Sequence, residues 1–176
     1  MIGAALLLAL QTVPVEAEPA AAPAPAATPQ RVPIDPAAAV ALFRTLCLPN
    51  LTDEAAFVTA VAASDVPFMA VPRRDAGPGQ TWRADRALLT YGTVRDGSRR
   101  CTLLGRTGGN VDQLGFSARV AEALALKTGR TRTGKGQAVT DWAAAGPEGR
   151  TVQISAATRN AVGGGTDIRL SATLAK

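Results

Sequence analysis

The sequence predicts an α+β fold, in which about three helices pack on one face of a mainly antiparallel sheet of five or six strands. Apolar residues recur at helical spacing in three segments and alternate with polar residues in several others. In the alternating segments the apolar side chains occupy one face only, which is typical of an antiparallel sheet with its second face in water. Asp96-Gly97 lies between two such segments and is a strong hairpin signal.

The first helix is expected to begin where the composition turns from Ala/Pro-rich to periodic. Asp35 is a good N-cap, and Pro36 fits the first helical position because its missing N–H is not needed there. Val40, Phe43 and Cys47 then share one apolar stripe. We therefore expect Cys47 to face the core.

Two further helices are expected along the chain. Thr52 is the predicted N-cap of the second helix, whose buried face is expected to consist of Phe57, Val58 and Val61. The third is expected to begin at Asn110 and to end at Gly129, because glycine tolerates the left-handed backbone that closes many helices.

The remaining periodic segments predict strands. They lie at 87–94, 100–104, 137–144, 151–156 and 167–174. Trp82 is expected to begin the sheet, and residues 68–71 fit either a short strand or a packed extended segment. The last strand alternates most regularly, and its outward side chains are Asp167, Arg169, Ser171 and Thr173.

The N-terminus predicts export. Residues 2–10 are apolar and too short to span a bilayer, which takes about 20 residues, and small residues follow at a cleavage position. We therefore expect a signal peptide at 1–17, an Ala/Pro-rich disordered tether at 18–33 and a single domain at 34–176. The expected location is the periplasm, with no transmembrane anchor after cleavage.

The two cysteines predict one disulfide bond in that oxidising compartment. Cys101 shares a strand face with Leu103, and that face points toward Cys47 if it covers the first helix. Two buried thiols are the alternative. A zinc site is not expected, because two thiols without any histidine do not complete the usual zinc shell.

A net charge of +5 makes anionic partners plausible, because a basic protein attracts phosphates, acidic polysaccharides and lipid headgroups. Lys127, Arg130, Arg132 and Lys135 form the densest basic segment, which we interpret as a flexible loop for contact with an anion or partner. A solvated loop without a partner is the alternative. No aromatic residues are interleaved with these charges, so nucleic acid is not an expected partner.

The absence of histidine excludes Ser-His-Asp and Cys-His machinery and removes the commonest general base near neutral pH. No cofactor or metal site is expected. Residues 129–136 approach the phosphate-binding P-loop, but they end on Gly136 where a hydroxyl residue is required. A carboxylate pair for hydrolysis remains an alternative, with these candidates: Asp53, Glu54, Asp85, Asp141 and Glu148.

The order of landmarks resembles small exported proteins of unknown function that are common in alphaproteobacteria. These landmarks are a signal peptide, an Ala/Pro spacer, a helix with Phe43 and Cys47, an Ala-rich second helix, Trp82, and a strand carrying Cys101. The resemblance covers roughly residues 37–126 and implies a periplasmic location and a disulfide. It implies no activity and assigns no functional residue.

Together these observations lead to one hypothesis and two alternatives. We expect a non-enzymatic periplasmic module that binds an anionic envelope component or a protein partner, through the water-facing side of the sheet or the basic segment at 127–135. The alternatives are a hydrolase that uses two carboxylates and an inhibitor of a secreted enzyme.

Overall fold

The computed structural model describes residues 32–72 and 79–175. The expected signal peptide at 1–17 and nearly all of the expected tether at 18–33 lie outside these residues. The predicted domain start falls at a packed position, because Ile34 is 4% exposed and its N–H donates to the Arg106 carbonyl at 2.8 Å.

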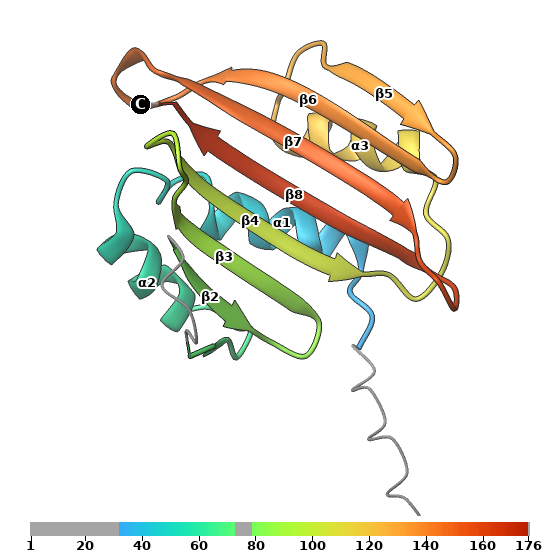
Figure 1. Cartoon of the computed structure of the whole chain (residues 1–176), viewed down its shortest axis with the longest axis horizontal. Helices are drawn as coiled ribbons and strands as arrows, with labels where there is room; N and C mark the ends of the chain where they lie inside the picture. The colour runs from blue at the N-terminus through green and yellow to red at the C-terminus, as the bar shows by residue number, and fades with distance from the viewer. Residues whose placement is uncertain (1–31, 73–78, 176) are drawn as a thin grey trace, which may run out of the picture.

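The described residues form one antiparallel sheet in the order β1-β2-β3-β4-β8-β7-β6-β5. Two meanders therefore lie side by side, and each contributes its last strand, β4 or β8, to the centre (Figure 1). The strands are β1 Met69–Ala70, β2 Gln80–Arg83, β3 Ala87–Thr93, β4 Arg99–Arg106, β5 Arg130–Gly134, β6 Gln137–Ala145, β7 Thr151–Asn160 and β8 Thr166–Leu174.

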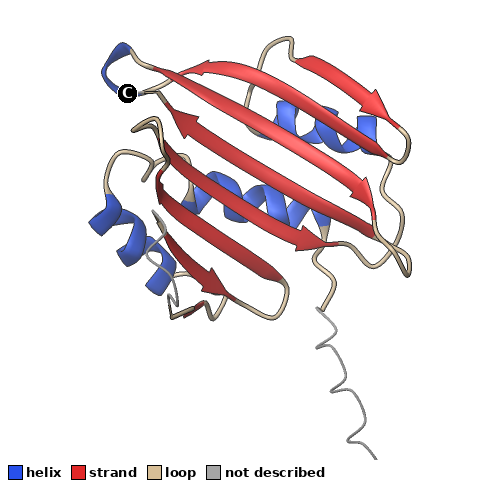
Figure 2. Cartoon of the chain, viewed as in Figure 1, coloured by secondary structure: helices blue, strands red, loops and turns tan. Residues whose placement is uncertain are grey.

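Three α-helices in the described part of the chain complete the fold: α1 Pro36–Leu46, α2 Glu54–Ala62 and α3 Gln113–Ala123. A short 3-10 turn, η1 Pro147–Gly149, joins β6 to β7. Helix α1 contacts β4, helix α3 contacts β6 and β7, and the two helices contact each other beneath the sheet (Figure 2).

The predicted α+β fold with a sheet of five or six strands is wrong, because the sheet has eight strands and dominates the molecule. The largest omission is β5, Arg130–Gly134, which was expected to be a flexible loop. It is an edge strand with all five residues exposed, so it carries no apolar alternation from which a strand can be recognised. Its Thr residues suit a strand, but their signal is weak beside that of a packed face.

The helix starts follow from local capping. Asp35 caps α1 as predicted, because its Oδ1 accepts from the Ala37 and Ala38 N–H groups at 2.8 and 3.0 Å. The predicted cap of α2 is wrong by one residue, since Asp53, not Thr52, accepts from the N–H groups of that first turn.

The end of α3 also differs from the prediction. The helix ends at Ala123, and Ala125 takes the left-handed conformation with φ 51°. The N–H of Leu126 donates to Ala121 at 2.8 Å and that of Ala125 to Glu122 at 3.1 Å, which is the Schellman pattern. Gly129 instead lies against the Trp142 indole, where a Cβ would clash with the ring.

The core lies between the helices and the sheet. Its largest fully buried side chains include Phe43, Phe57, Leu89, Leu103, Phe116 and Leu170. Cys47 and Cys101 form the predicted disulfide, with Cα atoms 5.5 Å apart, and both are fully buried. The bond ties the C-terminal end of α1 to a central strand.

Among residues 32–72 and 79–175, no helix has the length and apolar character that a bilayer crossing requires.

Candidate functional site: the open face of the sheet

Strand alternation and register assign each side chain of the sheet to one of two faces. Cys101 is bonded to Cys47 on the helical side, and its partner in the neighbouring strand, Ala172, shares that side. The intervening residues point the other way, where no described helix packs (Figure 1). We call this side the open face; its central residues are Thr90, Arg100, Thr102, Ser155, Arg169 and Ser171.

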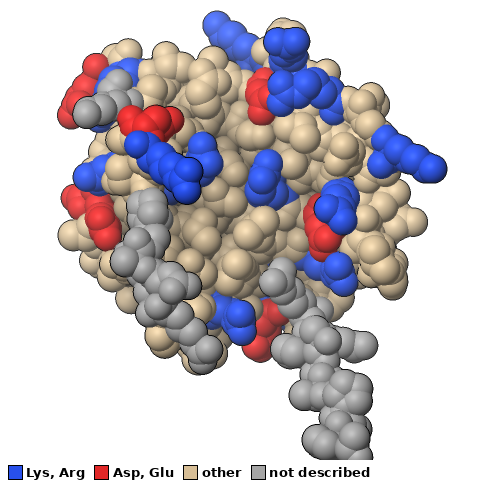
Figure 3. Space-filling view, in the orientation of Figure 1, with Lys and Arg blue, Asp and Glu red and all other residues tan. Residues whose placement is uncertain are grey.

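The open face is strongly basic. Seven arginines of the described strands belong to it, against two aspartates, Asp141 and Asp167. The arginines are Arg83, Arg100, Arg106, Arg130, Arg132, Arg159 and Arg169. Figure 3 looks onto this face and shows cationic groups spread across it, with fewer acidic groups between them. The positive charge of the protein is therefore concentrated on the sheet side that helices leave uncovered.

One row of this face carries a hydroxyl side chain on each of five neighbouring strands and ends in two charged residues. Paired residues on successive strands, from β2 across the centre to β5, are Thr81, Thr90, Thr102, Ser171, Ser155, Asp141 and Arg130. The Thr102 and Ser171 oxygens lie 3.1 Å apart. Hydroxyl groups both donate and accept hydrogen bonds, so the row offers such bonds from β2 across the centre to β7.

The adjacent row carries an arginine on every third strand. It begins at Arg83 on β2, reaches Arg169 on β8, and ends at Arg132 on β5, with apolar residues between them. Neighbouring strands lie about 4.8 Å apart, so these arginines are separated by about 14 Å across the sheet. The arginine row and the hydroxyl row therefore run in the same direction, across the strands of the sheet.

Two of the arginines are already paired with the aspartates. Arg106 Nε donates to Asp167 Oδ1 at 2.9 Å, and this carboxylate raises the pKa of the Arg106 guanidinium above its usual range. Arg132 Nη2 donates to Asp141 Oδ2 at 2.6 Å. Arg83, Arg100, Arg159 and Arg169 are exposed and belong to no ion pair among the described residues.

The open face carries no aromatic side chain. All seven aromatic residues of the chain lie in the described part, and six are buried while Phe68 packs partly buried against the core. Sugars and bases that bind by stacking on an exposed ring therefore find no platform here.

The structure divides the basic segment predicted to be a loop. Arg130 and Arg132 lie on β5 and belong to the open face, whereas Lys127 precedes the strand and Lys135 lies in the following hairpin turn. All four side chains are exposed. The loop interpretation is wrong, and the contact role of these residues remains a prediction.

Sequence reasoning did not find the centre of this face. Arg169 was expected to point outward, and its 9-residue strand confirms that alternation. Arg83, Arg159 and Arg106 were not singled out, because they join one surface only through pairings between distant parts of the chain. Alternation within each strand could show that Thr102 and Ser171 point outward. It could not show that the two residues lie opposite each other on neighbouring strands.

The carboxylates considered for hydrolysis are dispersed. Asp53 caps α2, Asp141 pairs with Arg132 on the open face, and Glu148 pairs with Arg150 beside β7. Three hollows lined wholly by described residues contain no Asp or Glu side chain. In the described part of the chain, no three His, Cys, Asp or Glu side chains are grouped to hold a metal ion.

Comparison of the chain with models of known protein families, with curated proteins and with solved structures finds no match.

Proposed function

We propose that this chain is a binding module of the cell envelope whose open face holds an acidic polysaccharide. Export into the periplasm after removal of the signal peptide at 1–17 belongs to the same proposal. The disulfide supports this location, since such bonds persist in oxidising compartments.

The observation that carries the proposal is that the hydroxyl row and the arginine row lie side by side and both run across the strands. A polysaccharide of uronic acid units presents hydroxyl groups along its length and carboxylates at intervals. The open face presents hydroxyls from Thr81 to Ser155 and, beside them, arginines at Arg83, Arg169 and Arg132. Arginine pairs with carboxylates through its planar fork of N–H donors, so the two chemistries are complementary.

The chemistry of the face favours an acidic polymer over the other anionic partners. Neutral sugars would need a stacking ring, which this face lacks. A lipid bilayer is engaged most firmly by apolar or aromatic side chains that enter it, and the middle of the face holds short hydroxyls.

Binding of a fluorescent oligogalacturonate, followed by anisotropy at fixed ionic strength, tests the proposal. The variant Arg83→Gln/Arg132→Gln/Arg169→Gln should bind between about tenfold and a hundredfold more weakly, because each exposed ion pair contributes up to about 1 kcal/mol. The variant Arg44→Gln/Arg86→Gln/Arg119→Gln removes the same charge from elsewhere on the molecule and should bind as the parent does.

Equal weakening in both variants would mean that net charge alone attracts the polymer, and the proposal would fail. Vesicles rich in phosphatidylglycerol and an acidic model protein serve as competing probes. Tighter binding to either of these than to the oligogalacturonate would also overturn the assignment.

A further inference from the structure

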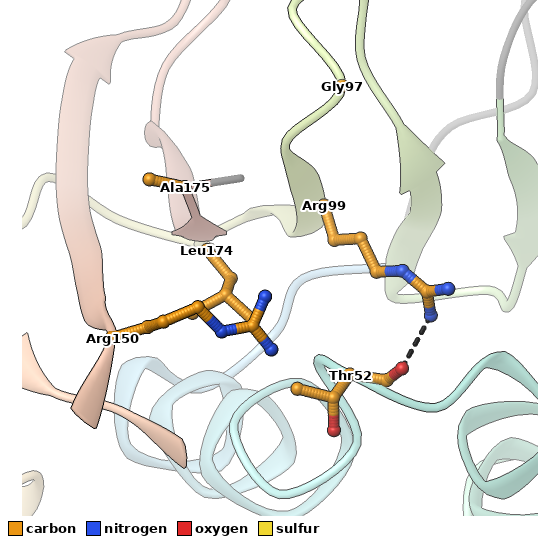
Figure 4. A pocket seen from close by; sticks show the side chains of 6 residues that line it. All are labelled: Thr52, Gly97, Arg99, Arg150, Leu174 and Ala175. Atoms are coloured by element: carbon orange, nitrogen blue, oxygen red, sulfur yellow. Dashed lines mark hydrogen bonds between the residues drawn. The ribbon is translucent and has the colours of Figure 1, made fainter. Parts of the chain in front are cut away.

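A second cationic site lies at one end of the central strands, away from the middle of the open face. It is a pocket of about 200 Å³ where β4 begins and β8 ends. Its lining consists of Thr52, Gly97, Arg99, Arg150, Leu174 and Ala175 (Figure 4).

Two guanidinium groups enter this pocket from opposite sides. Arg99 reaches in from the start of β4, and Arg150 from the residue that precedes β7, with Thr52 between and beneath them (Figure 4). None of the described residues that line the pocket is an Asp or Glu. Two cations that share a hollow repel each other, and an anion between them would reverse that effect.

Arg99 is held in place by groups that use only part of its donor capacity. Its Nη1 donates to the Thr52 carbonyl at 2.6 Å and to the Tyr91 hydroxyl at 3.3 Å. A guanidinium has five N–H donors, so the donors of Arg99 other than those on Nη1 retain capacity for a ligand.

Arg150 carries the more specific signal. Its Nη2 lies 3.1 Å from Glu148 Oε2, but its Nε is buried and is the single buried side-chain atom in the described part that has no hydrogen-bond partner. A buried donor without an acceptor lowers stability, and such atoms are rare. The Arg150 side chain is 38% exposed, so its Nη groups are the donors that a ligand in the pocket would meet.

We propose that this pocket binds a single phosphate group. A carboxylate has two oxygens, which one arginine fork satisfies, whereas a tetrahedral phosphate presents oxygens to both guanidiniums at once. The pocket is smaller than the 300–1,000 Å³ typical of sites for drug-sized ligands, which favours a small anion. The proposal does not rest on polysaccharide binding, because Arg99 and Arg150 lie outside the two transverse rows.

Titration with inorganic phosphate at constant ionic strength, followed by amide shifts in a ¹⁵N NMR spectrum, tests the site. We expect the largest shifts at Gly97, Arg99 and Leu174. Arg150→Gln should weaken binding about tenfold or more, since one charge-assisted pair is lost. Glu148→Gln should tighten it, because Arg150 is then released from its carboxylate.

Arg44→Gln on α1 is the matched control for net charge and should leave phosphate affinity unchanged. The ¹⁵N NMR spectrum of Arg150→Gln should keep the peak positions of the parent away from the pocket, which separates loss of the site from loss of the fold. Unchanged affinity in Arg150→Gln, or weakening of equal size in Arg44→Gln, would overturn the proposal. Acetate that binds as tightly as phosphate would overturn the choice of anion.

Discussion

The hydroxyl oxygens of Thr102 and Ser171 lie 3.1 Å apart, and they link the two meanders at the middle of the open face, between the Arg100–Thr173 and Arg106–Asp167 contacts of the same two strands. Thr102 is 8% exposed, so its hydroxyl exchanges water for this partner when the sheet forms. A hydrogen bond of this kind contributes about 1 kcal/mol net.

Substitution of this pair should therefore show coupling. Thr102→Val and Ser171→Ala should each lower the free energy of unfolding by about 1 kcal/mol. The double variant should lose less than the sum of the two, because the second change removes a group that is already without its partner. Urea unfolding measures all three. Strictly additive losses would show that the two hydroxyls act separately.

Removal of the disulfide should be the most destabilising change among these. The bond closes a loop with a sequence separation of 54 residues. In the chain-entropy model such a closure contributes about 4 kcal/mol. We expect Cys47→Ala/Cys101→Ala to lose about this much by urea unfolding, and a reducing agent to destabilise the parent but not the variant. A loss below about 1 kcal/mol would contradict the prediction.

Tyr91 should make the stability sensitive to alkaline pH. Burial raises the pKa of its phenol above the usual value near 10, although the hydrogen bond and charge of Arg99 act against the shift. The folded state therefore favours the neutral phenol. Its contribution is complete below the pKa of the unfolded chain and is lost as the pH rises through the pKa of the folded state.

Two measurements check this behaviour. Tyr91 is the single tyrosine of the chain, so absorbance of the phenolate near 295 nm reports its titration directly. The midpoint should lie at higher pH in the folded protein than in urea. Tyr91→Phe loses the contacts to the Asn50 and Leu51 carbonyls and should be about 1 kcal/mol less stable at neutral pH. Coincident folded and unfolded midpoints would contradict the assignment.

Ala125→Gly should stabilise the protein. Ala125 has φ 51° at the end of α3, a left-handed conformation in which glycine is not penalised by a Cβ. We expect a gain of up to about 1 kcal/mol in the thermal or urea transition. Ala123→Gly within α3 is the control and should lose about 1 kcal/mol, since its backbone is helical. A loss in both variants would show that the end of the helix does not behave as described.

Asp141→Asn should increase the affinity for oligogalacturonate. The substitution removes the carboxylate that Arg132 contacts at 2.6 Å and leaves the arginine free on the open face. We expect tighter binding by a few-fold and a steeper dependence on salt, because one more cation is available to the polymer. Asp85→Asn, in the turn after β2, removes the same charge elsewhere and should have little effect. Equal gains in both would favour net charge as the cause.

Local signals predicted the individual elements better than their assembly. The Asp35 cap, the apolar stripe of α1 and the alternation of β8 each depend on residues close in sequence, and the structure has them where they were expected. The disulfide could also be predicted, since Cys47 and Cys101 each fall on an apolar face. By contrast, the edge strand β5 has no buried side, so no periodicity marks it.

The candidate site was harder to predict for the same reason. Arg83 and Arg169 come together only because β4 pairs with β8, a choice between strands far apart in the sequence. The charge cluster at 127–135 could be recognised from the sequence because its four members lie within nine residues. The arginines share the open face because of the register in which distant strands pair, and this register cannot be read from the amino-acid composition.

The central position of β8 has a consequence for how this chain acquires its structure. Thr166–Leu174 is the last strand of the described chain, yet it lies in the centre of the sheet and joins the two meanders, because it pairs with β4 on one side and β7 on the other. Until it is in place, both of those strands present unpaired edges of the type that recruits other chains. A loss of a few residues near position 174 should therefore promote aggregation, whereas a similar loss from β5, at the rim, should leave most of the sheet intact. The eight-stranded sheet is therefore continuous only when β8 has paired with both β4 and β7.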